Sequence, residues 1–213
     1  MKKSSRGELA HAWFGERNVL NLYNKARTYE REIGVSYWKE LRRRLAFQFG
    51  EENVEKMAGA FCALSPNNSE DSNWRDLESM WQAWRQGKVL KDVSVHTYGA
   101  NKSKAKQILT GQHPLTVLNG RKTRSMYHNI VEPQDRTYVT VDGHMVSVWQ
   151  GKRLTMDQAV LTDKEYTVIE AGIKIIALRA GLIPCQLQAI LWLAHRRIHR
   201  VFYKPQLALE LQA

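Results

Sequence analysis

The chain has 213 residues and a formal net charge of +11, with 43% hydrophobic and 25% charged residues, which excludes a disordered protein and favours a polyanionic partner. No apolar run reaches the roughly 18 residues that span a bilayer, and no secretory signal is expected, because no apolar stretch follows the basic start of the chain. Cys62 and Cys185 are too few for a disulfide scaffold or an iron–sulfur cluster, so we expect a cytoplasmic protein in which both are buried free thiols.

Apolar residues recur at helical spacing along most of the chain, which predicts an all-α protein. The predicted helices cover residues 8–32 (as one or two helices), 37–49, 52–64, 73–86, 102–109, 114–118, 121–130, 142–149, 163–179 and 184–201. Ser36 and either Thr162 or Asp163 are expected as N-caps, and Pro184 suits a first helical turn. Residues 138–141 are the one convincing β-prone run, too short to imply a sheet.

The predicted helix 73–86 carries large apolar side chains at helical spacing. They are Trp74, Leu77, Trp81 and Trp84. Aromatic side chains of this kind can stack on nucleic-acid bases, but a helical stripe is more often the face that packs into a core. We therefore predict that this stripe is core.

Basic residues occur in clusters, which strengthens the expectation of a nucleic-acid partner. The clusters are Lys39 with Arg42, Arg43 and Arg44; Lys102 with Lys104 and Lys106; Arg121 with Lys122 and Arg124; and Arg196 with Arg197 and Arg200. Two of these clusters flank the residues with the strongest chemical signal.

That signal is in residues 118–123 (LNGRKT) and 141–144 (VDGH). The first places Lys122 just after a glycine turn at the start of a helix, and the second places Asp142 just after the β-prone run. An amine and a carboxylate that converge can attack a sugar carbon and stabilise its developing positive charge. The pair predicts chemistry on DNA.

Four short segments, in this order along residues 55–150, resemble the helix-hairpin-helix DNA glycosylase superfamily of the endonuclease III type. They are residues 64–69 (LSPNNS) with a later Asn73, residues 98–105 (YGANKSKA), residues 118–124 (LNGRKTR) and residues 141–144 (VDGH). The order of the four is more specific than any one of them.

The resemblance implies a two-lobed helical bundle with a helix-hairpin-helix-like element and a cleft between the lobes. Residues 1–213 would form a single glycosylase-like domain, with helices of 1–50 and 151–213 completing the lobes. The chain departs from the family in a hairpin about two residues shorter, in lacking the iron–sulfur cysteines, and in Gly143, which stands where the family has threonine. The glycine leaves room beside Asp142, which would suit a bulky modified base.

Breaking an N-glycosidic bond gives the deoxyribose oxocarbenium character, which a carboxylate near C1′ stabilises. Asp142 is the candidate, and an ordinary N-cap is its structural alternative, compatible with catalysis. Lys122 is the candidate amine that attacks C1′ and forms a Schiff base, with phosphate binding as the alternative. Without that attack, Asp142 would activate water and leave an abasic site.

Such an enzyme must flip its target base out of the stack and fill the vacancy. The resemblance assigns that role to Asn67, with Asn68 as the alternative, although both also suit a turn. The base pocket is assigned to Tyr127 and His144. His128 and Trp149 could contribute to it, but helical core is an equal alternative for Tyr127, His128 and Trp149.

The remaining expected DNA contacts are in the hairpin and the basic helix before it. They are Asn119, Gly120, Arg121, Thr123, Arg124, Lys102 and Lys104. His195 and His199 have a metal-compatible spacing, but the neighbouring arginines favour a solvated, phosphate-contacting helix face. A P-loop is rejected because its upstream glycine and strand are missing. No metal and no cofactor is expected.

We therefore predict a monomeric DNA glycosylase, with or without abasic lyase activity, that excises a damaged or modified base from double-stranded DNA. A hypermodified pyrimidine of a phage genome is one substrate to test, because relatives in this superfamily act in phage DNA modification and in defence against it. The alternatives are a base-modifying enzyme on the same scaffold and a non-catalytic DNA-binding module.

Overall fold

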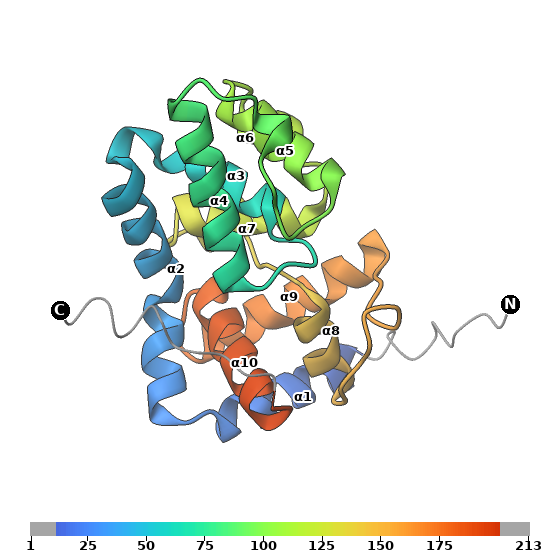
Figure 1. Ribbon diagram of the computed structural model, residues 1–213. Helices are drawn as coiled ribbons and strands as arrows, with labels where there is room; N and C mark the ends of the chain where they lie inside the picture. The colour runs from blue at the N-terminus through green and yellow to red at the C-terminus, as the bar shows by residue number, and fades with distance from the viewer. Residues whose placement is uncertain (1–11, 201–213) are drawn as a thin grey trace, which may run out of the picture. The chain divides into compact units, whose positions relative to one another are not determined.

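The structure is a computed structural model that describes residues 12–200 (Figure 1). Its α-helices are α1 (Ala12–Lys25), α2 (Thr28–Phe49), α3 (Val54–Leu64), α4 (Glu70–Arg85), α5 (Gly99–Leu109), α6 (Pro114–Val117), α7 (Arg121–Val131), α8 (Gly143–Gln150), α9 (Asp163–Arg179) and α10 (Pro184–Ile198). Short 3-10 helices, η2 and η3, cover Glu51–Asn53 and Leu90–Asp92. The described residues contain no strand, and the all-α prediction is confirmed.

The helices divide into two compact units. The discontinuous unit contains the described chain up to Glu40 and again from Pro133, and the continuous unit is Leu41–Glu132 between them. Helix α2 runs through the boundary without a break. Each unit is described in turn.

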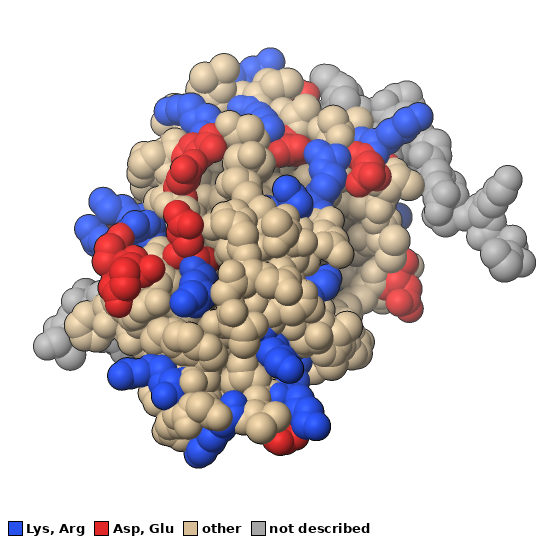
Figure 2. Space-filling view, turned by 90° about the horizontal axis from the view of Figure 1, so that it is seen from above, with Lys and Arg blue, Asp and Glu red and all other residues tan. Residues whose placement is uncertain are grey.

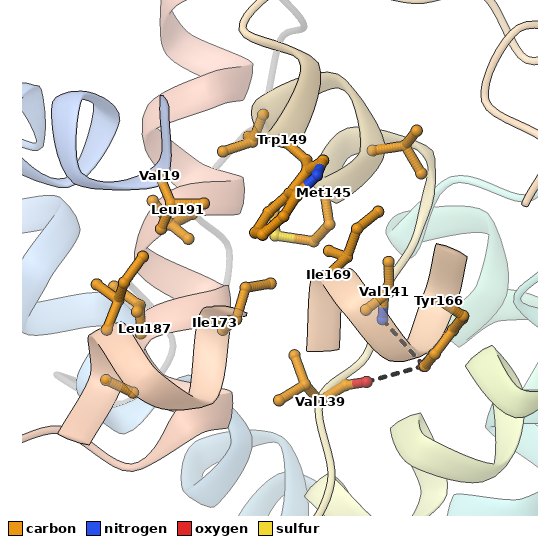
Figure 3. Packing of buried hydrophobic residues seen from close by; sticks show 14 residues of the cluster. Val19, Val139, Val141, Met145, Trp149, Tyr166, Ile169, Ile173, Leu187 and Leu191 are labelled. Atoms are coloured by element: carbon orange, nitrogen blue, oxygen red, sulfur yellow. Dashed lines mark hydrogen bonds between the residues drawn. The ribbon is translucent and has the colours of Figure 1, made fainter. Parts of the chain in front are cut away.

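The core of the discontinuous unit is formed by α1, α8, α9 and α10 (Figure 3). Trp149 of α8, with 3% of its surface exposed, lies inside this core, which is the alternative given for it. Two glycines make the space for its ring: a β-carbon at Gly15 would lie 1.9 Å from Cε2, and one at Gly172 would lie 2.4 Å from Cη2. Any other residue at either position would displace the indole.

A buried ion pair joins the start of α2 to the end of α10 in the same unit. Glu30, which is 1% exposed, accepts from Arg197 Nε at 2.7 Å and from the backbone N–H of Arg27 at 2.8 Å. The hydrogen bond with Glu30 raises the pKa of the Arg197 guanidinium. A buried carboxylate is costly without partners, so Glu30 must keep its bonds to Arg197 and to the Arg27 N–H. These bonds hold the corner between α1 and α2 in place.

The core of the continuous unit surrounds α3, which is buried along most of its length and packs against α4, α5, α6 and α7. A β-carbon at Gly59 would lie 2.6 Å from the Pro114 ring, so the start of α6 lies directly on α3. In α4, Trp74, Leu77 and Trp81 are buried, and Trp81 stacks on the half-buried Trp84. The prediction that this stripe is core is confirmed.

Several helix boundaries differ from the prediction for local reasons. Helix α2 begins at Thr28, so Ser36 lies within it, where its hydroxyl hydrogen-bonds the carbonyls of Glu32 and Ile33. Helix α4 begins three residues before the predicted start at 73, because Ser69 accepts from the backbone N–H of Ser72 and caps it.

Other boundary predictions hold. Thr162 forms a capping box with Glu165 at the start of α9, and Pro184 occupies the first turn of α10.

Cys62 and Cys185 are buried free thiols, as predicted, and burial raises the pKa of both, that of Cys185 to about 12. Residue 201, where the last helix was predicted to end, lies outside the described residues, and α10 ends at Ile198.

Candidate functional site

The backbone that leads into Asp142 is fixed by the hydroxyl of Tyr166 on α9 (Figure 3). The hydroxyl donates to the carbonyl of Val139 at 2.8 Å and accepts from the backbone N–H of Val141 at 3.1 Å. Both valines are buried. The β-prone run is therefore an extended segment held by a side chain instead of by a neighbouring strand.

Asp142 is the N-cap of α8, as its structural alternative anticipated. Its Oδ1 accepts from the backbone N–H of Met145 at 3.0 Å, and the residue is half-buried. Among the described residues, the second carboxylate oxygen has no hydrogen bond. One oxygen thus fixes the orientation of the carboxylate, and the other remains available to a ligand.

Gly143 is not required by close packing. A β-carbon at this position would lie 3.4 Å from that of Ala159, which is ordinary van der Waals contact. The glycine is exposed. Space beside Asp142 is therefore present, as the sequence suggested, and a small side chain could occupy it.

Three histidines gather beside this cap in the discontinuous unit. The Nδ1 atoms of His144 and His195 are 3.2 Å apart, and the rings of His195 and His199 are 4.4 Å apart between centroids. His195 is only 4% exposed, and its Nε2 has no hydrogen-bond partner within the described residues. Burial, followed by the charges of His144 and His199, lowers the pKa of His195 to about 4.

The prediction that α10 presents a solvated basic face here is wrong. His195 is buried, Arg197 pairs with the buried Glu30, and the Arg196 guanidinium lies 4.3 Å above the Trp192 ring. The prediction failed because it weighed the charges of neighbouring arginines and had no information about what each side chain packs against.

The buried neutral imidazole makes stability depend on pH. The folded pKa of His195, about 4, lies below the ordinary value of 6.5, so the unfolded chain takes up the proton first as the pH falls. Stability from this group is complete above pH 6.5 and is lost towards pH 4. We expect the free energy of unfolding to fall by about 2 kcal/mol between pH 6.5 and about pH 5 from this group. The free energy of unfolding, measured by urea titration, should fall over this pH range in wild type but not in His195→Gln. An equal fall in the two proteins would contradict the prediction.

In the continuous unit, the loop between α3 and α4 is held by the buried carboxylate of Asp76, which is 2% exposed. Asp76 accepts from Asn68 Nδ2 at 2.8 Å and from the backbone N–H of His96 at 2.9 Å, and its Oδ1 lies 2.7 Å from His96 Nδ1. Thr97 adds a 2.7 Å hydrogen bond to the carbonyl of Pro66. Sequence inspection missed Asp76 and His96, which lie twenty residues apart within no motif.

This anchoring separates the roles of Asn67 and Asn68. The Asn68 side-chain amide donates hydrogen bonds within the unit, to the Asp76 carboxylate and to the carbonyl of Leu64. Asn67 is exposed, has a φ of 54°, and its side chain makes no hydrogen bond within the part of the chain that the structure describes. Of the two, Asn67 is the residue that a firmly held loop presents to solvent.

The predicted hairpin consists of α6, a turn at Leu118 to Gly120, and α7. Gly120 is the N-cap of α7, and the Thr123 hydroxyl donates to its carbonyl at 3.0 Å. Arg124 donates to the carbonyls of Leu115 and Leu118 and so ties the turn to α6. Asn119 and Gly120 are exposed, and Arg121 is half-buried with contacts of its own.

Lys122 is half-buried on the first turn of α7 and lies near α3. Its charge opposes the rise in the pKa of the buried Cys62 thiol. One turn later on the same helix face, Met126 Sδ accepts from Ser65 Oγ at 3.5 Å. The face of α7 that carries Lys122 therefore lies beside the start of the Asn67 loop.

The other expected contacts of the continuous unit divide between core and surface. Tyr127 is buried, and burial, followed by the charge of Glu55, raises its pKa to about 12; it packs in the core, and its place in a base pocket stays a prediction. His128 is half-buried and packs edge-on against it. Lys102 is half-buried with its ammonium bonded to the carbonyl of Lys91, and Lys104, two residues later in α5, is also half-buried.

The candidate residues thus belong to two units. Asp142 and His144 lie in the discontinuous unit, and Asn67, Lys122 and the rest of the hairpin lie in the continuous unit. Convergence of Lys122 with Asp142, and the cleft it implies, stay predictions. Within residues 12–200, no group of three or more His, Cys, Asp or Glu side chains is arranged to hold a metal ion. None of the helices in that range has the length and apolar character needed to cross a bilayer.

Comparison with known proteins assigns nearly the whole chain to one group. Residues 3–199 match a family of unknown function (DUF7178). The chain belongs to this family. No curated protein and no solved structure matches it.

Proposed function

We propose that this protein is a DNA glycosylase that releases a damaged or modified base by cleaving the N-glycosidic bond. The observation that carries the proposal is the half-buried Asp142 carboxylate. One of its oxygens is held by the Met145 N–H at the start of α8, and the other has no hydrogen bond among the described residues. A preorganised carboxylate of this kind stabilises positive charge that develops beside it.

In the proposed reaction, the bond between C1′ and the base breaks as the sugar gains oxocarbenium character. Asp142 lies opposite this charge and orients the attacking group. The attacking group is either the Lys122 amine, which gives a Schiff base and abasic lyase activity, or a water molecule, which gives a simple abasic site. Tyr166 supports this role indirectly, since it fixes the backbone that carries the carboxylate.

The continuous unit supplies the features that support DNA binding. Asn67 is exposed on an anchored loop, where it could fill the space left by a flipped base. The start of α7 offers backbone N–H groups and the positive end of a helix dipole, which suit a phosphate. Lys122 and Arg121 add charge there.

The net charge of +11 favours a nucleic-acid partner but does not indicate which part of the surface binds it. Figure 2 shows one face of the molecule, on which lysine and arginine side chains are mixed with acidic ones in the upper part of the view, predominate along its lower edge and surround a largely uncharged centre. Binding there would depend on individual contacts more than on one continuous basic patch. We propose that double-stranded DNA is bound by a cytoplasmic monomer.

A non-catalytic DNA-binding module is the second candidate, and one observation favours it. The cap of α8 accounts for Asp142 without any reaction, because one of its oxygens already accepts from Met145. Such a module would bind DNA with strong salt dependence and yield no product. A base-modifying enzyme on this scaffold would change the base without releasing it.

One experiment separates these functions. The protein is incubated with duplexes that contain ordinary, oxidised, hydroxymethylated or glucosylated pyrimidines, and free base and alkali-labile sites are measured. Release of one base supports the glycosylase and identifies its substrate. Binding without release from any duplex would contradict it and favour the module, and a base altered in place would favour the modifying enzyme.

Asn67→Gly is expected to lower turnover on the substrate so identified by roughly tenfold, because the vacancy left by the flipped base is no longer filled. Glycine accepts the φ of 54°, so the free energy of unfolding should stay within about 0.5 kcal/mol of wild type. Single-turnover base release and urea unfolding measure the two effects. Unchanged turnover would contradict the role of Asn67.

Asn68→Ala provides the matched comparison. Removal of this amide leaves the buried Asp76 with one partner fewer, so stability should fall by about 1–3 kcal/mol. A loss of stability at 68 and a loss of turnover at 67 would separate the anchor of the loop from its tip.

A further inference from the structure

The loop between α8 and α9, residues 151–162, is tied to the first turns of α8 (Figure 1). Its anchor is Ser147, which is 3% exposed. The Ser147 hydroxyl donates to the carbonyl of Gly143 at 2.8 Å and accepts from the backbone N–H of Leu154 at 3.2 Å. The loop is therefore held in a fixed place beside the helix start that carries Asp142.

The apolar side chains of this loop form an inner and an outer set. The inner set, which packs against the core of the discontinuous unit, is Leu154, Ala159 and Leu161. The outer set is Met156 and Val160, which face solvent with 69% and 76% of their surfaces exposed. Apolar surface left in water is unfavourable, and apolar side chains that gather on a surface typically mark a binding site.

This outer set continues the surface around Asp142. A β-carbon at Gly143, the next residue, would lie 3.4 Å from the β-carbon of Ala159 and, among the described residues, within 4 Å of no other side chain beyond its chain neighbours. Ala159 lies between Met156 and Val160 in the chain, and its backbone N–H donates to the Met156 carbonyl at 3.2 Å. An open apolar surface thus begins one residue from the proposed catalytic carboxylate.

We propose that the target base is a pyrimidine with a bulky apolar group at C5, and that an apolar shelf beside Asp142 receives this group. The shelf consists of Gly143, Met156, Ala159 and Val160. This inference rests on the proposed glycosylase function, which brings the base to Asp142. An apolar group covers the shelf and leaves water, whereas a polar one loses its hydrogen bonds with water to side chains that offer none.

The rate of base release from a substituent series tests the substrate class. The duplexes carry uracil with a hydrogen, a methyl, a hydroxymethyl or a hexynyl group at C5, and kcat/KM is measured for each. Wild type should release the hexynyl base at least roughly ten times faster than the hydroxymethyl base, because only the hydrocarbon chain gains apolar contact. Base release with no preference for the hexynyl group would overturn the inference and leave the glycosylase standing.

Variants of the shelf show whether the preference arises there. The double variant Met156→Ser, Val160→Ser should lower the ratio of hexynyl to hydroxymethyl release roughly tenfold, and an unchanged ratio would overturn the inference. Gly143→Val fills the open space at a residue whose φ is not positive, and it should slow release of the hexynyl base most. Leu178→Ser is the matched control, since it removes a 73% exposed apolar side chain from the far end of α9 in the same unit and should keep the wild-type ratio.

NMR of carbon-13-labelled methionine methyl groups tests the shelf without turnover. The Met156 signal, assigned by its loss in Met156→Leu, should shift on addition of the hexynyl duplex and stay in place with the unsubstituted one. This shift without base release from any duplex would support the shelf and contradict the glycosylase, whereas release of the hexynyl base without the shift would overturn the shelf alone. A lower unfolding temperature in the double serine variant than in Leu178→Ser would also overturn it, because the chain itself would then cover these side chains.

Discussion

Asp142→Asn is expected to lower the single-turnover rate of base release by roughly a thousand-fold, equivalent to about 4 kcal/mol of transition-state stabilisation. Asparagine caps a helix as well as aspartate does, so its side-chain oxygen can still accept from the Met145 N–H. The substitution therefore removes the charge opposite the oxocarbenium ion and keeps the start of α8.

Two measurements accompany the rate. Thermal unfolding should stay close to wild type, and DNA affinity should be unchanged or higher, because a negative charge near phosphate is lost. Asp163→Asn is the matched control, since it removes the same charge from the first turn of α9 in the same unit. Full activity in Asp142→Asn would show that the site is assigned wrongly, and equal losses in the two variants would indicate a general effect of charge.

The part of this site that the sequence predicts is local. A cap is decided by a residue and the three that follow it, so the start of α8 at Asp142 and the capping box at Thr162 could be inferred from spacing alone. The same holds for the glycine turn before α7. Ser36 was predicted as an N-cap, but it lies inside the longer helix α2.

The part that the sequence does not predict depends on contacts between distant residues. His144 and His195 are 51 residues apart, and Asp76 and His96 are 20 apart. Periodicity places each on a helix or in a loop but says nothing about its partner. For the same reason Arg196 and Arg197 looked like a solvated face, whereas one lies on Trp192 and the other on Glu30.

The division into units also explains why neither cluster alone supplies every expected role. The discontinuous unit holds the Asp142 carboxylate with histidines beside it, whereas the DNA contacts expected in the hairpin, in the basic helix before it and at residues 67 and 68 all lie in the other unit. The continuous unit holds the exposed Asn67 and the Lys122 helix start, which suit binding and nucleophilic attack. Variants in the discontinuous unit should therefore affect transition-state stabilisation, and variants in the continuous unit should affect DNA binding and nucleophilic attack.

Lys122 gives the sharpest test in the continuous unit. Borohydride added during base release is expected to trap a covalent protein–DNA adduct, because it reduces the Schiff base formed when the Lys122 amine displaces the base at C1′. Lys122→Ala and Lys122→Arg should both lose the adduct. The arginine variant should keep DNA affinity within a few fold, because its guanidinium still binds phosphate but cannot act as the nucleophile.

Lys56→Ala serves as the control, since Lys56 is also half-buried, carries the same charge, lies in the same unit and is not among the expected DNA contacts. Its adduct should form as in wild type. Base release by wild type without any adduct would instead mean that water attacks C1′ under the influence of Asp142. Lys122 would then be a phosphate contact, and Lys122→Arg would release base at close to the wild-type rate, whereas Lys122→Ala would bind DNA more weakly with a smaller salt dependence.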